Sequence, residues 1–287
     1  MKKPILALGG GGRVAALLKA AFALTGETHL IWQSRGALEN GICFDPLGPQ
    51  GDVEMRAAMR GRKVVFALAG VTPASGSGLE VNTLLARQVL RAAAAEDIKH
   101  IFFISTAAVY GNSDQAHHED DAAEPVSPYG REKLAMEAVI RADETAIGKT
   151  ILRIGNIAGA DQLLGRVGQA PDVFLEQFSD GGFPERSYIG PVTLAKVLTQ
   201  LFDRAISGYA LPEVLNIATP NGVAMDALLR AAEIDFQARP APNTAIGKVV
   251  FNTNRLMRLY SFAPHASDPV RMVDELQQVL AHERPFR

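Results

Sequence analysis

The sequence feature that most constrains the fold is a run of glycines near the N-terminus. Gly9–Gly12 follows a short apolar segment, Ile5–Leu8, and precedes a helix-forming segment, Arg13–Leu24. From Gly9 to Ala15 the chain reads Gly-x-x-Gly-x-x-Ala, in the strand–turn–helix context that such a motif needs. Glycine permits the tight turn and lets an anion such as a pyrophosphate approach the N–H groups that open the helix. The alternative is a tight turn without a ligand. A Walker A loop is excluded because no Gly-Lys-Ser/Thr ending follows.

The first half of the chain alternates short apolar runs with helical segments. We expect strands at Ile5–Leu8, His29–Gln33, Gly41–Phe44, Lys63–Leu68, His100–Ser105 and Thr150–Ile154. We expect helices between them at Arg13–Leu24, Val53–Met59, Asn82–Glu96 and Pro128–Glu144. Several strand candidates are unbroken apolar runs, which is typical of strands buried on both faces. The pattern predicts an α/β protein whose parallel sheet is covered by helices on both faces.

After Ile154 this alternation gives way to loops rich in Gly, Pro and Asp. The elements expected there are helices at Thr193–Ala205, Met225–Glu233 and Asp268–His282, and a strand at Leu215–Ala218. The length of 287 residues fits one large domain or a domain with an attachment. We predict a dinucleotide-binding domain over residues 1–157, to which residues 188–219 return, and a substrate-binding region made of residues 158–187 and 220–287.

Composition excludes several classes of protein. Hydrophobic residues make up 47% and charged residues 21% of the chain, which excludes a disordered or fibrous protein. Lys+Arg 29 against Asp+Glu 31 leaves no basic excess, so no nucleic-acid partner is expected. No apolar run approaches the ~20 residues that cross a bilayer, and Gly9–Gly12 interrupts the start too early for a signal peptide. The single cysteine, Cys43, excludes an intrachain disulfide, and we expect a soluble, cytoplasmic protein.

The second expected strand bears on which dinucleotide would bind. NAD sites usually place Asp or Glu at the end of this strand, about 20 residues after the glycine motif. Here Ile31–Arg35 carries no carboxylate, while Arg35 and Arg13 are suited to a 2′-phosphate. We therefore expect NADP, with NAD less favoured; the alternative is that Arg35 is a solvated loop residue. Asp45, beyond the third strand, is placed either to meet the adenine or as a turn residue before Pro46.

A hydroxyl, a phenol and an amine occupy positions where they can meet. Thr106 follows the fifth expected strand, at the edge of the sheet where open α/β proteins bind ligands. Tyr129 and Lys133 lie four residues apart at the start of a helix, on one face of it. A nearby ammonium would lower the pKa of the phenol from its reference of ~10, so that Tyr129 exchanges a proton near neutrality. Tyr-x-x-x-Lys alone is a weak signal, which the glycine loop and the Ser127–Pro128 helix start strengthen.

With these motifs, the sequence resembles the extended short-chain dehydrogenase/reductase family, in its NAD-dependent epimerase/dehydratase branch. The resemblance covers almost the whole chain and rests on the segments GGGGRVA, FALAG, STAAVYG, PYGREK and LRIGNIAG, and on Asn82 at the start of its helix. Weaker landmarks, RSYIGPV, LNIA and NRL, follow in the second half. The resemblance implies a Rossmann-type doubly wound parallel sheet with a small C-terminal substrate-binding region. It also implies catalysis by Thr106, Tyr129 and Lys133, with Asn82 supporting them or the cofactor.

The resemblance also implies which residues bind the cofactor and the substrate. The expected cofactor-binding residues are Gly9, Gly12, Arg13, Val14, Arg35, Asp45, Leu68, Ala69, Gly70, Tyr129 and Lys133. Asn156 and Arg186 are the expected substrate contacts. Two departures stand out: the family's His-Val-x-Asp stretch reads GPVT over Gly190–Thr193, and the segment from Asn156 to Arg186 is shorter than in sugar-nucleotide epimerases. They argue against a full nucleotide-sugar substrate and leave a smaller sugar or carbonyl compound open.

The leading hypothesis is an NAD(P)-dependent oxidoreductase or epimerase that acts on a sugar, a sugar nucleotide or a related alcohol or carbonyl compound. Tyr129 would exchange the proton, and Lys133 would lower the pKa of Tyr129 and hold the ribose. Thr106 would orient the substrate oxygen during hydride transfer. The alternative is a catalytically idle NADP-binding sensor or scaffold, against which the intact Thr106, Tyr129 and Lys133 argue. The sequence does not separate epimerase, dehydratase and reductase.

Three further features are interpreted more simply. His117–Asp121 collects metal-ligand residue types, but adjacent loop side chains rarely converge on one ion, so no metal is expected and we interpret it as a polar loop over the mouth of the site. Arg153 would either bind an anionic group of the substrate or be structural. The helices that start at Asn82 and Pro128 would form the dimer face if the chain is a homodimer, as their equivalents do in the family.

Overall fold

A seven-stranded parallel sheet forms the centre of the computed structural model, which describes residues 5–27, 29–73, 78–113, 115–165 and 172–283. Its strands are β1 (Ile5–Leu8), β2 (Leu30–Ser34), β3 (Ile42–Cys43), β4 (Val64–Ala67), β5 (His100–Thr106), β6 (Gly148–Ile154) and β10 (Val214–Ile217). They lie in the order β10-β6-β5-β4-β1-β2-β3, all parallel. The order reverses between β1 and β4, where doubly wound folds bind dinucleotides. The predicted Rossmann-type fold class is therefore confirmed.

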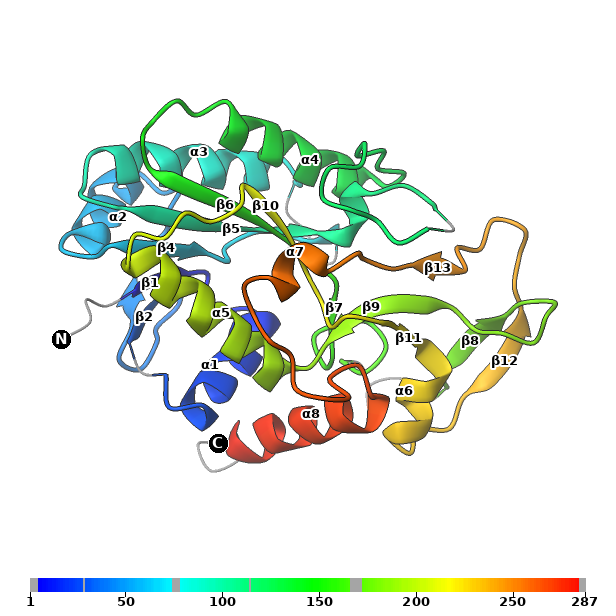
Figure 1. Ribbon diagram of the computed structural model, residues 1–287. Coiled ribbons are helices and arrows are strands. Elements are labelled where there is room, and N and C mark those ends of the chain that lie inside the picture. Colours follow the sequence, from blue (N-terminus) through cyan, green and yellow to red (C-terminus); the bar gives the residue numbers. More distant parts are fainter. Residues whose placement is uncertain (1–4, 28, 74–77, 114, 166–171, 284–287) are drawn as a thin grey trace.

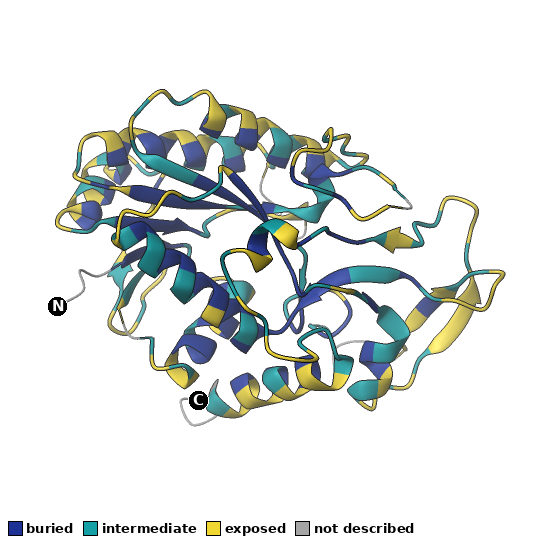
Figure 2. Cartoon of the chain, in the orientation of Figure 1, coloured by how far each residue is buried: buried dark blue, intermediate teal, exposed yellow. Residues whose placement is uncertain are grey.

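Helices cover both faces of this sheet (Figure 1). On one face lie α2 (Gly51–Met59), α3 (Val81–Ala94) and α4 (Pro128–Arg141), and on the other lie α1 (Arg13–Leu24), α5 (Pro191–Ile206) and α8 (Pro269–Glu283). Every residue of β1 and β4 is buried, which explains their unbroken apolar sequences. Figure 2 shows that burial concentrates in the sheet and on the helix sides that face it. Two hydrophobic cores result, one on each face.

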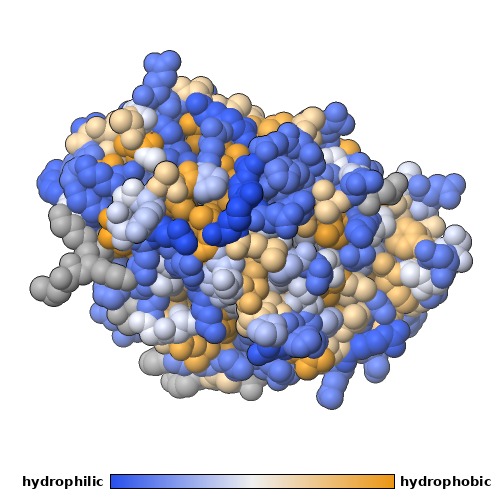
Figure 3. All heavy atoms as spheres, viewed as in Figure 1, coloured by the Kyte–Doolittle hydropathy of each residue, from blue (hydrophilic) through white to orange (hydrophobic). Residues whose placement is uncertain are grey.

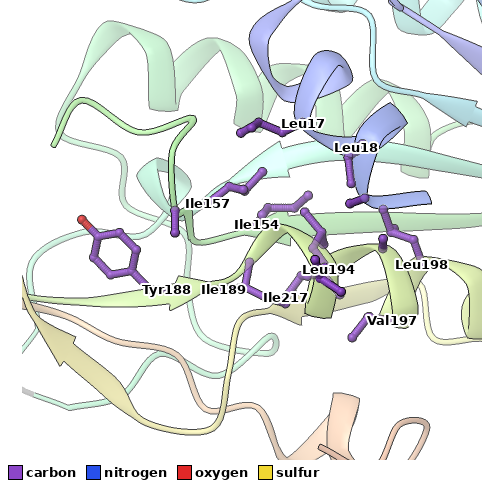
Figure 4. Close-up of a cluster of buried hydrophobic side chains, with 14 of the residues drawn as sticks. Leu17, Leu18, Ile154, Ile157, Tyr188, Ile189, Leu194, Val197, Leu198 and Ile217 are labelled. Carbon is purple, nitrogen blue, oxygen red and sulfur yellow. The ribbon is translucent and has the colours of Figure 1, made fainter. Parts of the chain in front are cut away.

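The core beneath α1 and α5 extends past the sheet into the second half of the chain. Figure 4 shows ten of its residues, contributed by helices, by the central sheet and by a smaller sheet: Leu17, Leu18, Ile154, Ile157, Tyr188, Ile189, Leu194, Val197, Leu198 and Ile217. The hydroxyl of Tyr188 points away from the other labelled side chains. Each buried aliphatic side chain of this kind stabilises a fold by about 1.5–3 kcal/mol. This shared core therefore joins the two halves.

The second half contains short strands that the sequence pattern did not predict. β7 (Asn156–Ile157), β9 (Glu185–Ile189), β11 (Gly222–Ala224) and β13 (Lys248–Val249) form one small sheet, and β8 (Phe174–Gln177) pairs with β12 (Gln237–Pro240). Two short helices, α6 (Met225–Ala231) and α7 (Asn254–Met257), accompany them. Strands of two to five residues are too short to display a clear alternation of apolar and polar residues, so they are read as loops.

In the first half every expected strand and helix is present, with ends that differ by a few residues. For example, α4 ends at Arg141 and not at Glu144. The division into domains stays a prediction. α5 and β10 pack with the central sheet, as expected of residues 188–219, whereas β9 crosses the predicted boundary at residue 188.

The surface seen in Figure 3 interleaves hydrophilic and hydrophobic residues and carries no single dominant apolar area. Within the described ranges, no helix combines the length and the apolar character that crossing a bilayer requires.

Candidate active site

The glycine loop after β1 is held against the loop after β4. Gly9 has a φ of 96°, a conformation that side chains with a Cβ rarely adopt. A Cβ at Gly9 would also lie 2.6 Å from the Cα and N atoms of Ala69. The Gly9 N–H donates to the backbone O of Gln33 at 3.0 Å and faces its Oε1 at 3.2 Å. Glycine is therefore required at this position, where the loops at the switch point meet.

The N-terminus of α1 opens beside this loop. Gly12 is the N-cap, no side chain caps the helix, and its first turn carries no acidic residue. Apart from its own turn of chain, no described residue places an atom within 4 Å of the point where a side chain at Gly12 would begin. Arg13 is exposed, and its Nη1 lies 2.5 Å from the position of a Cβ at Gly165, while Val14 packs against the core. The uncapped N–H groups and the helix dipole suit a phosphate group.

Asn82 ties the loop after β4 to the start of α3. Its side chain is buried, donates to the backbone O of Val71 at 3.1 Å and of Leu79 at 2.9 Å, and accepts from Val71 N at 3.1 Å. A Cβ at Gly70 would lie 2.7 Å from Asn82 Oδ1 and 3.5 Å from Lys133 Nζ. The loop, α3 and α4 therefore converge here, and the polar atoms of Asn82 are used to fix the backbone.

The start of α4 rests directly on the segment that follows β5. Ser127 caps the helix by accepting from Gly130 N at 3.0 Å, and Pro128 occupies the first turn, as expected. Any Cβ at Gly130 would overlap the carbonyl oxygen of Ala108, which lies in a 3-10 helix, η2 (Ala107–Val109). The glycine after Tyr129 thus allows the close contact that brings the PYGREK and STAAVYG segments together.

Two adjacent hydroxyls at the end of β5 have different surroundings. Ser105 is buried and donates to Glu137 Oε1 at 2.6 Å. Thr106 is half-buried, and its Oγ1 accepts from Ala108 N at 3.2 Å. Because no acceptor for the Thr106 O–H is found in the described part of the chain, this hydroxyl keeps its proton available for a substrate oxygen.

The phenol and the amine are both affected by burial. Lys133 is 5% exposed and donates to Ile104 O at 3.0 Å. Burial lowers the pKa of Lys133 to about 8, although the carboxylates of Glu137 and Glu132 act to raise it. Burial raises the pKa of Tyr129 to about 12, with no offset from the ammonium. The expected lowering of the Tyr129 pKa is therefore not seen, because Lys133 is directed to the strand carbonyl and the phenol holds its proton at neutral pH.

The expected substrate contacts lie in the small sheet beyond β6. Asn156 pairs with Tyr188 across β7 and β9, and its side chain hydrogen-bonds to the Tyr188 hydroxyl. Arg186 donates from Nη1 to Gly247 O at 3.0 Å and from Nη2 to Ile246 O at 2.8 Å. Its guanidinium is thus bound largely to backbone carbonyls, and it ties β9 to the segment that leads into β13.

The residues expected at the adenosine end lie beyond β2, β3 and β4. Arg35 is exposed, and Asp45 Oδ1 accepts from Leu47 N at 3.1 Å, so this carboxylate stabilises its own turn. Leu68 is half-buried and packs against the core, next to Ala69, which contacts the glycine loop. All of these positions border the carboxyl edge of the sheet.

A buried ion pair behind the site was not found from the sequence. Arg153 donates from Nε to Glu137 Oε1 at 3.1 Å and from Nη2 to Oε2 at 2.7 Å, and its guanidinium lies 4.7 Å from the Tyr110 ring centre. Arg153 is 2% exposed and its guanidinium is paired with Glu137, which favours the structural alternative. The sequence signal for this pair was the position of Glu137 four residues after Lys133. The same spacing is typical of an exposed helix face, so it did not indicate burial.

The polar loop 117–121 is attached to the second half of the chain. The His117 ring stacks on Tyr110 with centres 4.5 Å apart, and Asn216 N donates to Glu119 Oε1 at 3.0 Å. Arg255 donates to Asp120 Oδ2 at 2.6 Å. Over the described ranges, no group of three or more His, Cys, Asp or Glu side chains is arranged to hold a metal ion.

Comparison with known proteins identifies the family. The NAD dependent epimerase/dehydratase family matches residues 40–205, and the chain belongs to it. A UDP-glucose 4-epimerase of Azospirillum brasilense is 41% identical over 95 residues, which are 32% of this chain and 27% of that protein. A probable UDP-arabinose 4-epimerase of Oryza sativa subsp. japonica is 27% identical over 203 residues, 60% of this chain and 47% of that protein. The chain thus matches about a quarter to a half of the length of these relatives.

Solved structures share the fold over nearly the whole chain. A UDP-glucose 4-epimerase from Brucella ovis in complex with NAD superposes with a TM-score of 0.78 and 18% identity, over 94% of this chain and 96% of that one. One from Stenotrophomonas maltophila, with bound NAD and formylated UDP-arabinopyranose, gives a TM-score of 0.77 and 18% identity over 99% of both chains. The comparisons therefore support the family resemblance, and they do not support the expected preference for NADP.

Proposed function

We propose that the protein is an NAD-dependent enzyme that transfers a hydride to and from a carbon of a sugar nucleotide. The observation that carries this proposal is the convergence of Thr106 and the Tyr129–Lys133 helix start on the carboxyl edge of the sheet, beside the open N-terminus of α1. Family membership supports the same conclusion. The idle sensor or scaffold gains no support from the relatives, which are named as epimerases.

The residues at the switch point fit a dinucleotide. Gly12 leaves open space at an uncapped helix N-terminus, where the pyrophosphate would bind, and Gly9 keeps the loop close to Ala69. The nicotinamide, when bound, supplies the hydride acceptor and donor. Lys133 would hold the ribose hydroxyls once its side chain turns from Ile104 O toward the ribose. Its charge would then favour the phenolate of Tyr129.

The other groups of the site would handle the proton and the substrate oxygen. Thr106 would donate its free O–H to the reacting oxygen and orient it. Tyr129 would exchange the proton with that oxygen as the carbonyl forms and is reduced again. Because burial raises the pKa of Tyr129 to about 12, the phenol is protonated at neutral pH. Its action as a base toward the substrate hydroxyl would therefore depend on the Lys133 charge.

NAD is the proposed cofactor, in place of the NADP expected from Arg13 and Arg35. The family is described as NAD dependent, and solved structures of the same fold are named as complexes with NAD. Arg35 is exposed at the end of β2, which agrees with the alternative that it is a solvated loop residue.

A UDP-sugar is the proposed substrate class. The relatives are named as epimerases of UDP-glucose and UDP-arabinose, and the Stenotrophomonas maltophila structure holds a UDP-sugar. This chain covers 99% of that structure's chain, so it has the fold of a protein that holds a nucleotide-sized ligand over nearly its whole length. The smaller substrate that the sequence left open is therefore not favoured. A cytoplasmic location and a homodimer through α3 and α4 stay predictions.

The test begins with the purified protein. Denaturation and mass analysis should release NAD and not NADP, and incubation with UDP-glucose or UDP-galactose should interconvert them. Tyr129→Phe should lower turnover by about 100- to 10,000-fold with NAD affinity retained, because it removes the proton-exchanging group. Tyr209→Phe, at a residue 65% exposed, makes the same chemical change as a control and should leave turnover unchanged. Normal turnover of Tyr129→Phe would contradict the assignment, and a chain that neither binds NAD nor converts any UDP-sugar would overturn the function.

A further inference from the structure

Glu137 lies one helical turn beyond Lys133 on α4 and is completely buried. Its two carboxylate oxygens accept four hydrogen bonds. The donors to Oε1 are Ser105 Oγ at 2.6 Å and Arg153 Nε at 3.1 Å, and the donors to Oε2 are Arg153 Nη2 at 2.7 Å and Arg141 Nη2 at 3.0 Å. A buried carboxylate with this many donors, two of them from one guanidinium, is held in a single orientation.

These bonds join α4 to consecutive residues of β5. Lys133 binds the carbonyl of Ile104, Glu137 binds the hydroxyl of Ser105, and the next residue is Thr106. Arg153 lies opposite Ser105 in β6 and extends the same connection to a second strand. The relative position of the amine on α4 and the hydroxyl at the end of β5 therefore depends on the Glu137 carboxylate.

The charge of Glu137 also acts on Lys133. Burial pulls the pKa of Lys133 down to about 8, and Glu137 is the stronger of the two carboxylates that oppose this, the other being Glu132. Among the described residues, the other groups in contact with Lys133 or Glu132 here are neutral: the Ile104 carbonyl of β5 and the Met136 sulfur on Lys133 Nζ, and the Thr83 hydroxyl of α3 on Glu132. Asn82 of α3, also neutral, lies with Lys133 Nζ beside Gly70. The neighbouring η2 contains only Ala and Val and so adds no charged side chain. Arg153 of β6 is paired with Glu137.

We propose that Glu137 is a positioning residue for the reaction: it aligns α4 with the end of β5 and keeps the buried lysine charged where the cofactor ribose would bind. The inference rests on the proposed role of Lys133. It predicts that removing the Glu137 charge changes how cofactor binding depends on pH. A purely structural glutamate would alter stability and leave that pH dependence unchanged.

The test is the affinity for NAD measured from pH 6 to pH 9. Trp32, the single tryptophan, lies in β2 beside the glycine loop and provides an intrinsic fluorescence signal. In the native protein the affinity should fall as the pH rises through about 8, because Lys133 loses its proton. In Glu137→Gln the fall should begin at lower pH, giving affinity weaker by roughly fivefold at pH 8 and unchanged at pH 6. Arg141→Gln removes the outer, 34% exposed partner of the same carboxylate and should keep the native profile.

A second variant covers the case in which Glu137→Gln leaves Arg153 as an unpaired buried charge and does not fold. Glu137→Gln combined with Arg153→Met removes both charges, an exchange that buried ion pairs often tolerate. Because this variant also removes the Glu137 charge, it should shift the profile to lower pH as well. Ser105→Ala, which removes one neutral donor, should shift the profile in the same direction by less. Native profiles in folded Glu137 variants would overturn the proposal.

A direct measurement separates this inference from the proposed function. Nitrogen NMR of lysine-labelled protein, with the Lys133 signal assigned by Lys133→Met, reports the titration of the amine without cofactor or substrate. A lower titration midpoint in the Glu137 variants, together with no NAD binding by the native protein, would retain the effect of Glu137 on Lys133 and reject the enzyme. NAD binding with an unchanged midpoint would reject the role of Glu137 and retain the enzyme.

Discussion

The two halves of the molecule are stabilised in different ways. In the first half, β1 and β4 are entirely apolar and buried, and the helices on either side complete two hydrophobic cores. In the second half, side-chain hydrogen bonds to backbone fix short strands: Arg186 to the carbonyls of Ile246 and Gly247, and Ser187 Oγ to Phe251 N at 2.8 Å. Apolar burial therefore holds the central sheet, whereas polar links between distant segments add to the shared core in holding the short strands of the second half.

The largest expected effect concerns the apolar core. Leu198 on α5 is fully buried in the core shown in Figure 4, so Leu198→Ala should lower the free energy of unfolding by about 2–5 kcal/mol. Leu280→Ala on α8, at a residue 41% exposed, is the matched control and should cost less than about 1 kcal/mol. Denaturant unfolding measures both. An equal decrease in the free energy of unfolding of both variants would show that the buried core does not stabilise the fold more than its surface does.

A second effect should appear in the pH dependence of the central sheet. His100 in β5 is buried, and burial lowers its pKa from 6.5 to about 4. The unfolded chain therefore binds a proton below pH 6.5 that the folded chain does not bind until about pH 4. The associated stability is fully present above pH 6.5 and is lost as the pH falls to 4, by about 3 kcal/mol.

The His100→Gln variant isolates this contribution. Its free energy of unfolding should change less between pH 7 and pH 4.5 than that of the native protein, although its absolute stability is lower. Gln retains a side-chain nitrogen that can face Thr150, which the imidazole contacts at 2.9 Å. Identical pH dependence in both proteins would show that His100 does not contribute to the acid sensitivity of the sheet.

The smallest expected effect concerns a polar link of the second half. Tyr188 donates its hydroxyl to Asp161 Oδ2 at 2.8 Å, and the pKa of this carboxyl is raised by burial. Tyr188→Phe leaves a buried carboxyl without its phenol donor and should cost about 1–3 kcal/mol in thermal or denaturant unfolding. Tyr209→Phe at the surface should have no measurable effect. A Tyr188→Phe loss as large as that of Leu198→Ala would show that polar links contribute as much as apolar packing.

The first half was predictable because its signals are local. Long apolar runs fix the strands, and the glycine loop, the Ser127–Pro128 cap and the Tyr129–Lys133 spacing each follow from a few neighbouring residues. In the second half, the strand expected at Leu215–Ala218 is present as β10, but the strands of the two smaller sheets were missed. Their positions depend on partners far along the chain, such as Arg186 and residues 246–247.

Within the candidate site, the sequence located the groups but not their environments. Glu137 and Arg141 are spaced like an exposed helical ion pair, yet Glu137 faces Arg153 of β6 inside the protein. The direction of the Tyr129 pKa was predicted wrongly, since it depends on burial and on where the Lys133 ammonium points. Both are properties of tertiary structure and leave no pattern in neighbouring residues.

The position of β10 has a consequence for how the protein is made. This strand completes the central sheet by pairing with β6, yet the chain passes through β7, β8, β9 and the helix α5 before reaching it. During synthesis on the ribosome, the edge of β6 therefore stays unpaired until Ile217 has left the exit tunnel. A nascent chain that still lacks β10 leaves this edge of β6 open to pairing with other chains, an exposure of the kind that favours aggregation.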